Sequence, residues 1–295
     1  MLKLKGETFV VGDIHGDPVD LIRNQIYIED YPKQIKHIFL LGDIGFGFVR
    51  GRYRKRLSNI ISVLDSIKSL DDVSDDDKFI REFLYCVTNS AKDLVLSIMY
   101  VARLLTGNKD VQVYAIRGNH DNPDFWNKKT KLGKAVSKVD KNFHFLNDGF
   151  IEINNELWLT IGGAVSVDRF TADRIEGISW WAGEEMDGSF NEPLPIGYKK
   201  LTGILSHTGK VPSYADYKLP VSHTGMVREA LEREEKAIDS LLFRYNPSSW
   251  FYGHFHYPWA VVLPGVKFTC VGEHEMIPLP RCHCRKHQNR PRNRF

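Results

Sequence analysis

The sequence of 295 residues predicts an α/β fold built on two β-sheets. The first half of the chain has three β-branched or aromatic stretches, at about Thr8–Gly12, His37–Leu41 and Val111–Ile116. Helical stretches separate them, which is the pattern of βαβ units. The second half has several short apolar stretches with few helices between them. Two sheets accommodate this number of strands better than one.

The first strand leads into a predicted helix. In Asp17-Pro18-x-Asp20 an N-cap residue is followed by a proline in the first helical position and an acid in the first turn. We therefore expect a helix from Val19 to about Tyr27. Asp17 is interpreted as a helix cap and not as a metal ligand.

A helical insertion is predicted at about residues 50–110, between Asp43 and Asn119. Arg52–Leu70 is amphipathic, and the acid-rich segment 74–77 precedes apolar residues at helical spacing over Phe79–Leu105. Two interpretations stay open. The insertion is either a cap or partner-binding subdomain beside the site, or a helical hairpin that only covers a sheet.

The later strands are predicted to be short. We expect them at Phe143–Leu146, Phe150–Ile153, Leu157–Ile161, Ile204–Ser206 and Trp250–Tyr252, with a pair around Pro264-Gly265. All predicted elements belong to one domain, residues 1–280, and residues 281–295 form a basic tail.

The composition is that of a large globular enzyme, with 42% hydrophobic and 26% charged residues. No stretch of eighteen apolar residues predicts a membrane span, and the N-terminus lacks the apolar region of a secretion signal. We therefore expect a cytoplasmic protein that does not contact membranes. The four cysteines indicate no disulfide framework, and free thiols are favoured over zinc binding for Cys282 and Cys284.

The tail has six Lys or Arg residues and no acid, so the rest of the chain is mildly acidic although the whole carries a net charge of +3. The tail is a candidate contact for nucleic acid, and a solvated tail without a partner is the alternative.

Metal-binding residue types occur at the ends of five apolar stretches. They are, in order, Asp13-x-His15, Gly42-Asp43, Gly118-Asn-His-Asp121, Ser206-His207 and Gly253-His-Phe-His256. Because open α/β sheets place their sites at the carboxyl ends of strands, these segments are expected to meet around two divalent cations. Of the two similar histidines His207 and His223, we favour His207 as a ligand because it follows an apolar run directly.

A pair of divalent cations indicates hydrolysis of a phosphate ester, because two such ions neutralise the charge of the phosphate and generate hydroxide. Such a pair needs a bridging carboxylate, and Asp43 is the best candidate because it stands alone after the run Ile38–Gly42. Mixed His, Asp and Asn ligands favour Mn over Ca, with Fe, Zn, Ni or Mg as alternatives.

This succession of motifs resembles the calcineurin-like metallophosphoesterase superfamily. The stretch Gly162–Ser166, together with Ser179-Trp-Trp181 and Glu184-Glu185, resembles its prokaryotic or phage-type branch. The resemblance covers about Val10 to His256 and implies a four-layer α/β/β/α sandwich of two mixed sheets flanked by helices. It also implies a hydrolase that cleaves a phosphomonoester or phosphodiester by attack of metal-bound hydroxide. One metal would be held by Asp13, His15, Asp43 and His256, and the second by Asp43, Asn119, His207 and His254.

Three further residues receive roles from this resemblance. His120 would act beside the phosphate, either protonating the leaving oxygen or steadying the transition state. Protein Ser/Thr phosphatases of the superfamily carry an Asp and an Arg where this chain has Phe46 and Gly47. The acid that orients the catalytic histidine is therefore either missing or supplied from elsewhere, with Asp121 as the candidate, and Arg117 is the candidate phosphate contact.

The predicted substrate is nucleotide-like or a nucleic acid. The absence of the phosphatase Asp and Arg, the basic tail, and aromatic residues available for stacking at Phe125, Trp126, Trp180 and Trp181 favour this choice. One alternative is a protein phosphatase. Another, of a different class, is an interaction protein that binds metal and ligand without turnover.

Overall fold

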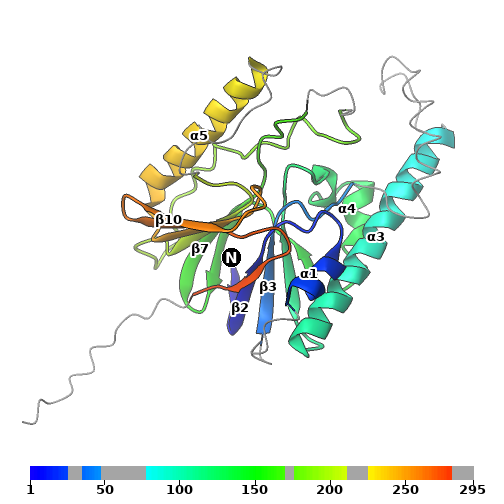
Figure 1. Cartoon of the computed structure of the whole chain (residues 1–295), viewed down its shortest axis with the longest axis horizontal. Coiled ribbons are helices and arrows are strands. Elements are labelled where there is room, and N and C mark those ends of the chain that lie inside the picture. Colours follow the sequence, from blue (N-terminus) through cyan, green and yellow to red (C-terminus); the bar gives the residue numbers. More distant parts are fainter. Residues whose placement is uncertain (26–34, 48–77, 170–175, 211–224, 281–295) are drawn as a thin grey trace, which may run out of the picture.

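The computed structural model describes residues 1–25, 35–47, 78–169, 176–210 and 225–280. Two β-sheets pack face to face, with helices on both outer sides (Figure 1). The predicted segment Arg52–Leu70, the helix start at 74–77, His223 and the basic tail lie outside the described residues. The limits of the domain and of the insertion therefore stay predictions.

The smaller sheet has five strands in the order β12-β2-β3-β4-β5. Strands β2, β3, β4 and β5 run parallel, and β12 is antiparallel to β2 at the edge. Their bounds are β2 Glu7–Val11, β3 Ile35–Leu41, β4 Gln112–Ile116, β5 Phe143–Phe145 and β12 Met276–Pro278.

The larger sheet has seven strands in the order β1-β6-β7-β8-β9-β11-β10. It is mixed, because β6 with β7 and β10 with β11 form antiparallel pairs, whereas β7, β8, β9 and β11 are parallel. Its strands are β1 Leu2–Leu4, β6 Gly149–Ile153, β7 Glu156–Ile161, β8 Gly203–Ser206, β9 Ser249–Tyr252, β10 Trp259–Leu263 and β11 Val266–Cys270.

The helices lie on the outer faces of the two sheets. On the smaller sheet lie α1 (Pro18–Gln25), α3 (Lys78–Thr106) and α4 (Lys131–Val136), and on the larger sheet lies α5 (Met226–Tyr245), as Figure 1 shows. A short 3-10 helix, η3 (Pro123–Phe125), precedes α4. As expected, Asp17 caps α1, since its Oδ1 accepts a hydrogen bond from Val19 N at 3.2 Å.

Alternation along the strands separates three apolar layers. Successive residues of a strand point to opposite faces, so Phe39 packs between the sheets while its neighbours Ile38 and Leu40 pack against α1 and α3. In the other sheet Phe251 faces the space between the sheets, and Trp250 lies in the layer under α5. The predicted four-layer α/β/β/α sandwich is confirmed.

Helix α3 packs on the smaller sheet through buried apolar side chains that include Val95, Ile98 and Met99. It matches the predicted stretch Phe79–Leu105. This contact agrees with the interpretation of a helix that covers a sheet, for the part of the insertion that the structure describes.

Two strands were not predicted. Both β1 and β12 have three residues, and each pairs at a sheet edge with a longer strand, β6 and β2 respectively. Neither stretch is rich in the β-branched and aromatic residues that mark a strand, so only the partner strand reveals them. Among the described helices, none has the length and continuous apolar character that crossing a bilayer would require.

Candidate metal centre

Asp13, His15 and His256 converge from the ends of β2 and β9. His15 Nε2 lies 2.9 Å from His256 Nε2, which in turn lies 3.3 Å from Asp13 Oδ2. Asp13 is fully buried, whereas both histidines are accessible. The three donor atoms lie within 4.8 Å of one another and form the first candidate metal group.

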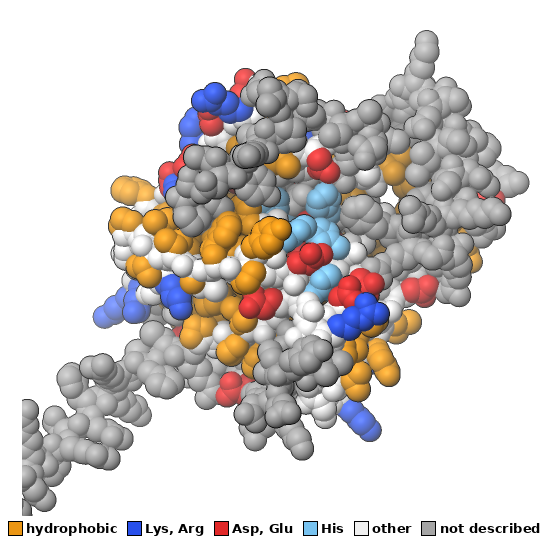
Figure 2. Space-filling view, in the orientation of Figure 1, with side chains coloured by type: hydrophobic (Ala, Val, Ile, Leu, Met, Phe, Trp, Pro, Cys, Tyr) orange, Lys and Arg blue, Asp and Glu red, His pale blue; other side chains and the backbone are white. Residues whose placement is uncertain are grey.

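Asp43, His207 and His254 form a second candidate group by the same criterion. His207 Nε2 lies 3.2 Å from Asp43 Oδ1 and 2.8 Å from Asn119 Oδ1. The structure thus brings all seven predicted ligands into two neighbouring sets. Figure 2 shows His and acidic side chains gathered near the centre of one face of the molecule.

The two carboxylates also tie the segments together. The backbone N–H of His120 donates to Asp43 Oδ1 at 2.8 Å, and that of His254 donates to Asp13 Oδ1 at 2.9 Å. A carboxylate that accepts an amide hydrogen bond on one oxygen keeps the other for a cation. These two bonds fix the loops after β4 and β9 against the loops after β3 and β2.

Backbone strain is concentrated at the candidate ligands. His15, Asp43, His254 and His256 all adopt positive φ, between 43° and 70°. This region is unfavourable for residues with a Cβ, and it persists where the surrounding packing imposes it, commonly at functional sites.

Two glycines allow the loops to approach the carboxylates closely. A Cβ at Gly118 would lie 2.0 Å from Asp43 N, and one at Gly253 would lie 2.2 Å from Asp13 Oδ1. Neither position accepts a larger residue without displacing a candidate ligand.

The donor atoms fit divalent cations. Asp13 Oδ2 is buried without a hydrogen bond from the described residues, which is costly unless a cation compensates it. His207 Nδ1 donates to Leu41 O at 2.7 Å, so its Nε2 is directed at Asp43 and Asn119. A histidine held by a carbonyl through one nitrogen is the usual arrangement of a metal ligand.

Electrostatics couple the second group to protons. Burial alone would lower the pKa of His207, but the Asp43 carboxylate raises it to about 9. Burial also disfavours ionisation of Asp43, yet the His207 and His120 rings hold its pKa well below the usual range. Since only neutral imidazole binds a metal, metal binding to this group releases the extra proton of His207.

Three predicted catalytic residues occupy different places. His120 lies in the centre, with Nε2 3.9 Å from Asp43 Oδ2. Asp121 is buried, and its carboxylate accepts hydrogen bonds from the backbone amides of residues 44, 45, 46 and 118. It therefore fastens the loop after β3 to the loop after β4. Burial, with Asp43 nearby, raises the pKa of Asp121 to about 6.

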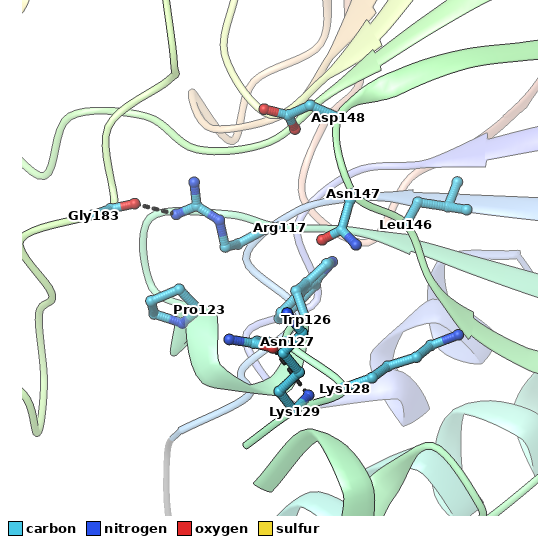
Figure 3. A pocket seen from close by; sticks show the side chains of 10 residues that line it. All are labelled: Arg117, Pro123, Trp126, Asn127, Lys128, Lys129, Leu146, Asn147, Asp148 and Gly183. Atoms are coloured by element: carbon cyan, nitrogen blue, oxygen red, sulfur yellow. Dashed lines mark hydrogen bonds between the residues drawn. The ribbon is translucent and has the colours of Figure 1, made fainter.

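Arg117 is not brought to the metal groups. Its Nη1 donates to Gly183 O at 2.7 Å, and its side chain lines a separate pocket (Figure 3). Arg117 and Asn119 belong to the same loop but line different pockets.

The pocket at the metal groups has a volume of about 440 Å³. Five residues of its lining belong to none of the five motifs, so the sequence did not predict them as site residues. They are Ser166, Val167, Asp168, Tyr257 and Glu273. Only proximity in the folded chain identifies them.

Ser166 makes a direct link to a candidate ligand. Asn119 Nδ2 donates to Ser166 Oγ at 2.9 Å, and Glu184 Oε1 accepts from Ser166 N at 3.1 Å. Ser166 thus orients the Asn119 amide so that Oδ1 faces His207.

The chain is similar in sequence to one family of known proteins. A sequence model of the calcineurin-like phosphoesterase family matches residues 8–258. No curated protein matches the sequence significantly. One solved crystal structure is 13% identical with a TM-score of 0.48, and the alignment covers 90% of both chains. Phosphopantetheinyl hydrolase (PptH) from Mycobacterium tuberculosis is 12% identical with a TM-score of 0.41, covering 91% of this chain and 90% of that one.

Proposed function

The chain belongs to the calcineurin-like phosphoesterase family and is a metal-dependent phosphoester hydrolase, and on this premise we propose that it works with two metal ions. The observation that carries the proposal is the pair of donor groups. Asp13, His15 and His256 would hold one ion. Asn119, His207 and His254 would hold the other, and Asp43 would bridge them.

Manganese is the proposed metal. The donors are imidazole nitrogens together with carboxylate and amide oxygens, which suit Mn, Fe or Zn better than Ca. When bound, two such ions neutralise the phosphate charge and supply the hydroxide nucleophile.

His120 is the proposed general acid. It lines the metal pocket and its backbone N–H is fixed to Asp43. An imidazole at this place can donate a proton to the leaving oxygen of the ester. Asp121 acts through the backbone: its four amide hydrogen bonds hold the loops that carry Asp43 and Asn119.

The proposed substrate is nucleotide-like. Three of the four aromatic residues first considered for stacking, Phe125, Trp126 and Trp181, are buried, so that part of the sequence argument is wrong. Tyr257 is the candidate for stacking on a base. It lines the metal pocket beside His256 and is 74% exposed, so its ring can stack on a base.

A substrate panel tests the proposal. Hydrolysis of a chromogenic phosphomonoester and phosphodiester, with and without Mn, establishes the activity and the ester class. Nucleotides, oligonucleotides and phosphopeptides are then compared in kcat/KM. Efficient cleavage of phosphopeptides alone would contradict the nucleotide-like substrate. If the protein binds two metal ions but cleaves none of the esters, the proposed enzymatic function is contradicted.

A further inference from the structure

A second pocket is lined by Arg117, at the start of the loop that follows β4. It has a volume of about 540 Å³, larger than the pocket at the metal groups. In Figure 3, Arg117 lies near Asp148 and Gly183, while Lys128 and Lys129 lie on the far side of Trp126. The remaining lining residues are Pro123, Asn127, Leu146 and Asn147.

Cationic side chains outnumber acids in the lining of this pocket, and Asp121, Glu184 and Asp187 also lie close enough to interact with the Arg117 guanidinium. Three cationic side chains line the pocket, those of Arg117, Lys128 and Lys129, against one acid, Asp148. Asp148 Oδ1 already accepts a hydrogen bond from Gly162 N at 2.8 Å. The two lysines are exposed, so they can follow a ligand without disturbing the core.

The Arg117 guanidinium has donors to spare. Among the described residues its one recorded hydrogen bond is that to Gly183 O, whereas a guanidinium carries five N–H donors. The planar fork of arginine matches the oxygens of a phosphate group, and lysines add point charges around it. We propose that this pocket binds a phosphate group at a site separate from the metal centre.

The phosphate can come from two sources. Free inorganic phosphate, the product of monoester hydrolysis, would act from this pocket as an effector through the loop shared by Arg117 and Asn119. Alternatively, a second phosphate of an extended substrate would occupy it while the scissile phosphate is at the metals. Both sources use the same cationic lining.

Calorimetric titration of the full-length, metal-loaded protein with inorganic phosphate tests the site itself. The wild type should bind phosphate in two events, and Lys128→Ala/Lys129→Ala should weaken one of them on the order of tenfold, since each lysine contributes a charged hydrogen bond. Arg117→Gln should weaken the same event. The matched control is Lys131→Ala/Lys134→Ala, which removes two exposed lysines of α4 outside the pocket.

Kinetics then separate the two sources. If the ligand is free phosphate, added phosphate should change the turnover of a small ester by the wild type. It should not change the turnover by Lys128→Ala/Lys129→Ala. If it is part of the substrate, the double variant should raise KM for an oligonucleotide about tenfold and leave the small ester unchanged.

Phosphate binding that is unchanged in Lys128→Ala/Lys129→Ala, or equal loss in the test and control variants, would overturn the proposal. The titration needs no turnover, so its outcome is independent of the proposed activity. Failure of the substrate panel with an intact second phosphate event would contradict the proposed function and leave this site standing.

Discussion

His15 Nε2 and His256 Nε2 lie 2.9 Å apart, although 241 positions separate the two residues in the chain. The buried Asp13 Oδ2 lies 3.3 Å from His256 Nε2 and 3.8 Å from His15 Nε2. Two imidazoles and one carboxylate at these distances present three lone-pair donors to a common point.

Asp43→Asn should remove metal and activity together. The wild-type carboxylate is buried and lies between His207 and His120, so the neutral amide removes the charge that would bridge two ions. Metal content after reconstitution with excess Mn, measured together with turnover, tests this. Asp17→Asn is the control, because Asp17 caps α1 at the surface. A variant that still holds two ions per chain would contradict the bridging role.

His120→Ala should keep both metal ions and lower kcat by about 10²–10⁴-fold, the usual contribution of a general acid. The comparison is with His144→Ala, which removes a half-buried histidine of β5 that bonds Gln112. Loss of metal in His120→Ala would instead identify His120 as a ligand, and unchanged turnover would exclude it as the acid.

Ser166→Ala should weaken the binding of one metal ion and leave the binding of the other unchanged. The variant loses the oxygen that accepts from Asn119 Nδ2, so the amide is no longer held towards His207. Outer contacts of this kind typically change metal affinity by about 10–100-fold. Titration with Mn should show the loss at one of two binding steps. Ser97→Ala, at an exposed position of α3, should leave both steps unchanged.

Glu234→Gln should make the stability of the protein less dependent on pH. Burial raises the pKa of Glu234 to about 7 from an ordinary value of 4.5. The folded state therefore binds a proton more tightly than the unfolded state, and this stabilisation, complete below pH 4.5, is lost as the pH rises through 7. The effect is at most about 3 kcal/mol.

Urea unfolding at pH 5 and pH 8 measures the difference for Glu234→Gln. The variant should lose less stability than the wild type between the two pH values. Glu229→Gln, an exposed acid of the same helix α5, should follow the wild type. If Glu234→Gln loses as much stability as the wild type between the two pH values, the Glu234 carboxyl group does not titrate between them.

Deletion of residues 281–295 should weaken oligonucleotide binding and reduce its dependence on salt concentration. The tail has six cationic residues, and each phosphate that they neutralise releases counterions. Binding is measured over a range of salt concentrations, and small-ester hydrolysis should not change. An unaltered salt dependence would indicate that the tail makes no contact with the oligonucleotide.

The sequence by itself determined the chemistry at the strand ends. Asp43 follows the run Ile38–Leu41, and the same relation of apolar strand to polar residue recurs at His207, so both the elements and the candidate donors were visible locally. Within each of the two sheets, parallel strands bring such ends to one edge. The number of strands predicted two sheets, and the resemblance of the motifs implied the four-layer architecture.

Only the tertiary structure decided where individual side chains are directed. Arg117 directly precedes the motif that Asp121 ends. The Asp121 carboxylate accepts hydrogen bonds from four backbone amides, whereas the Arg117 side chain lines a second pocket. Ser166 reaches Asn119 because β7 and β4 belong to sheets packed against each other. Contacts between loops of different sheets depend on packing geometry, which no local pattern of residues encodes.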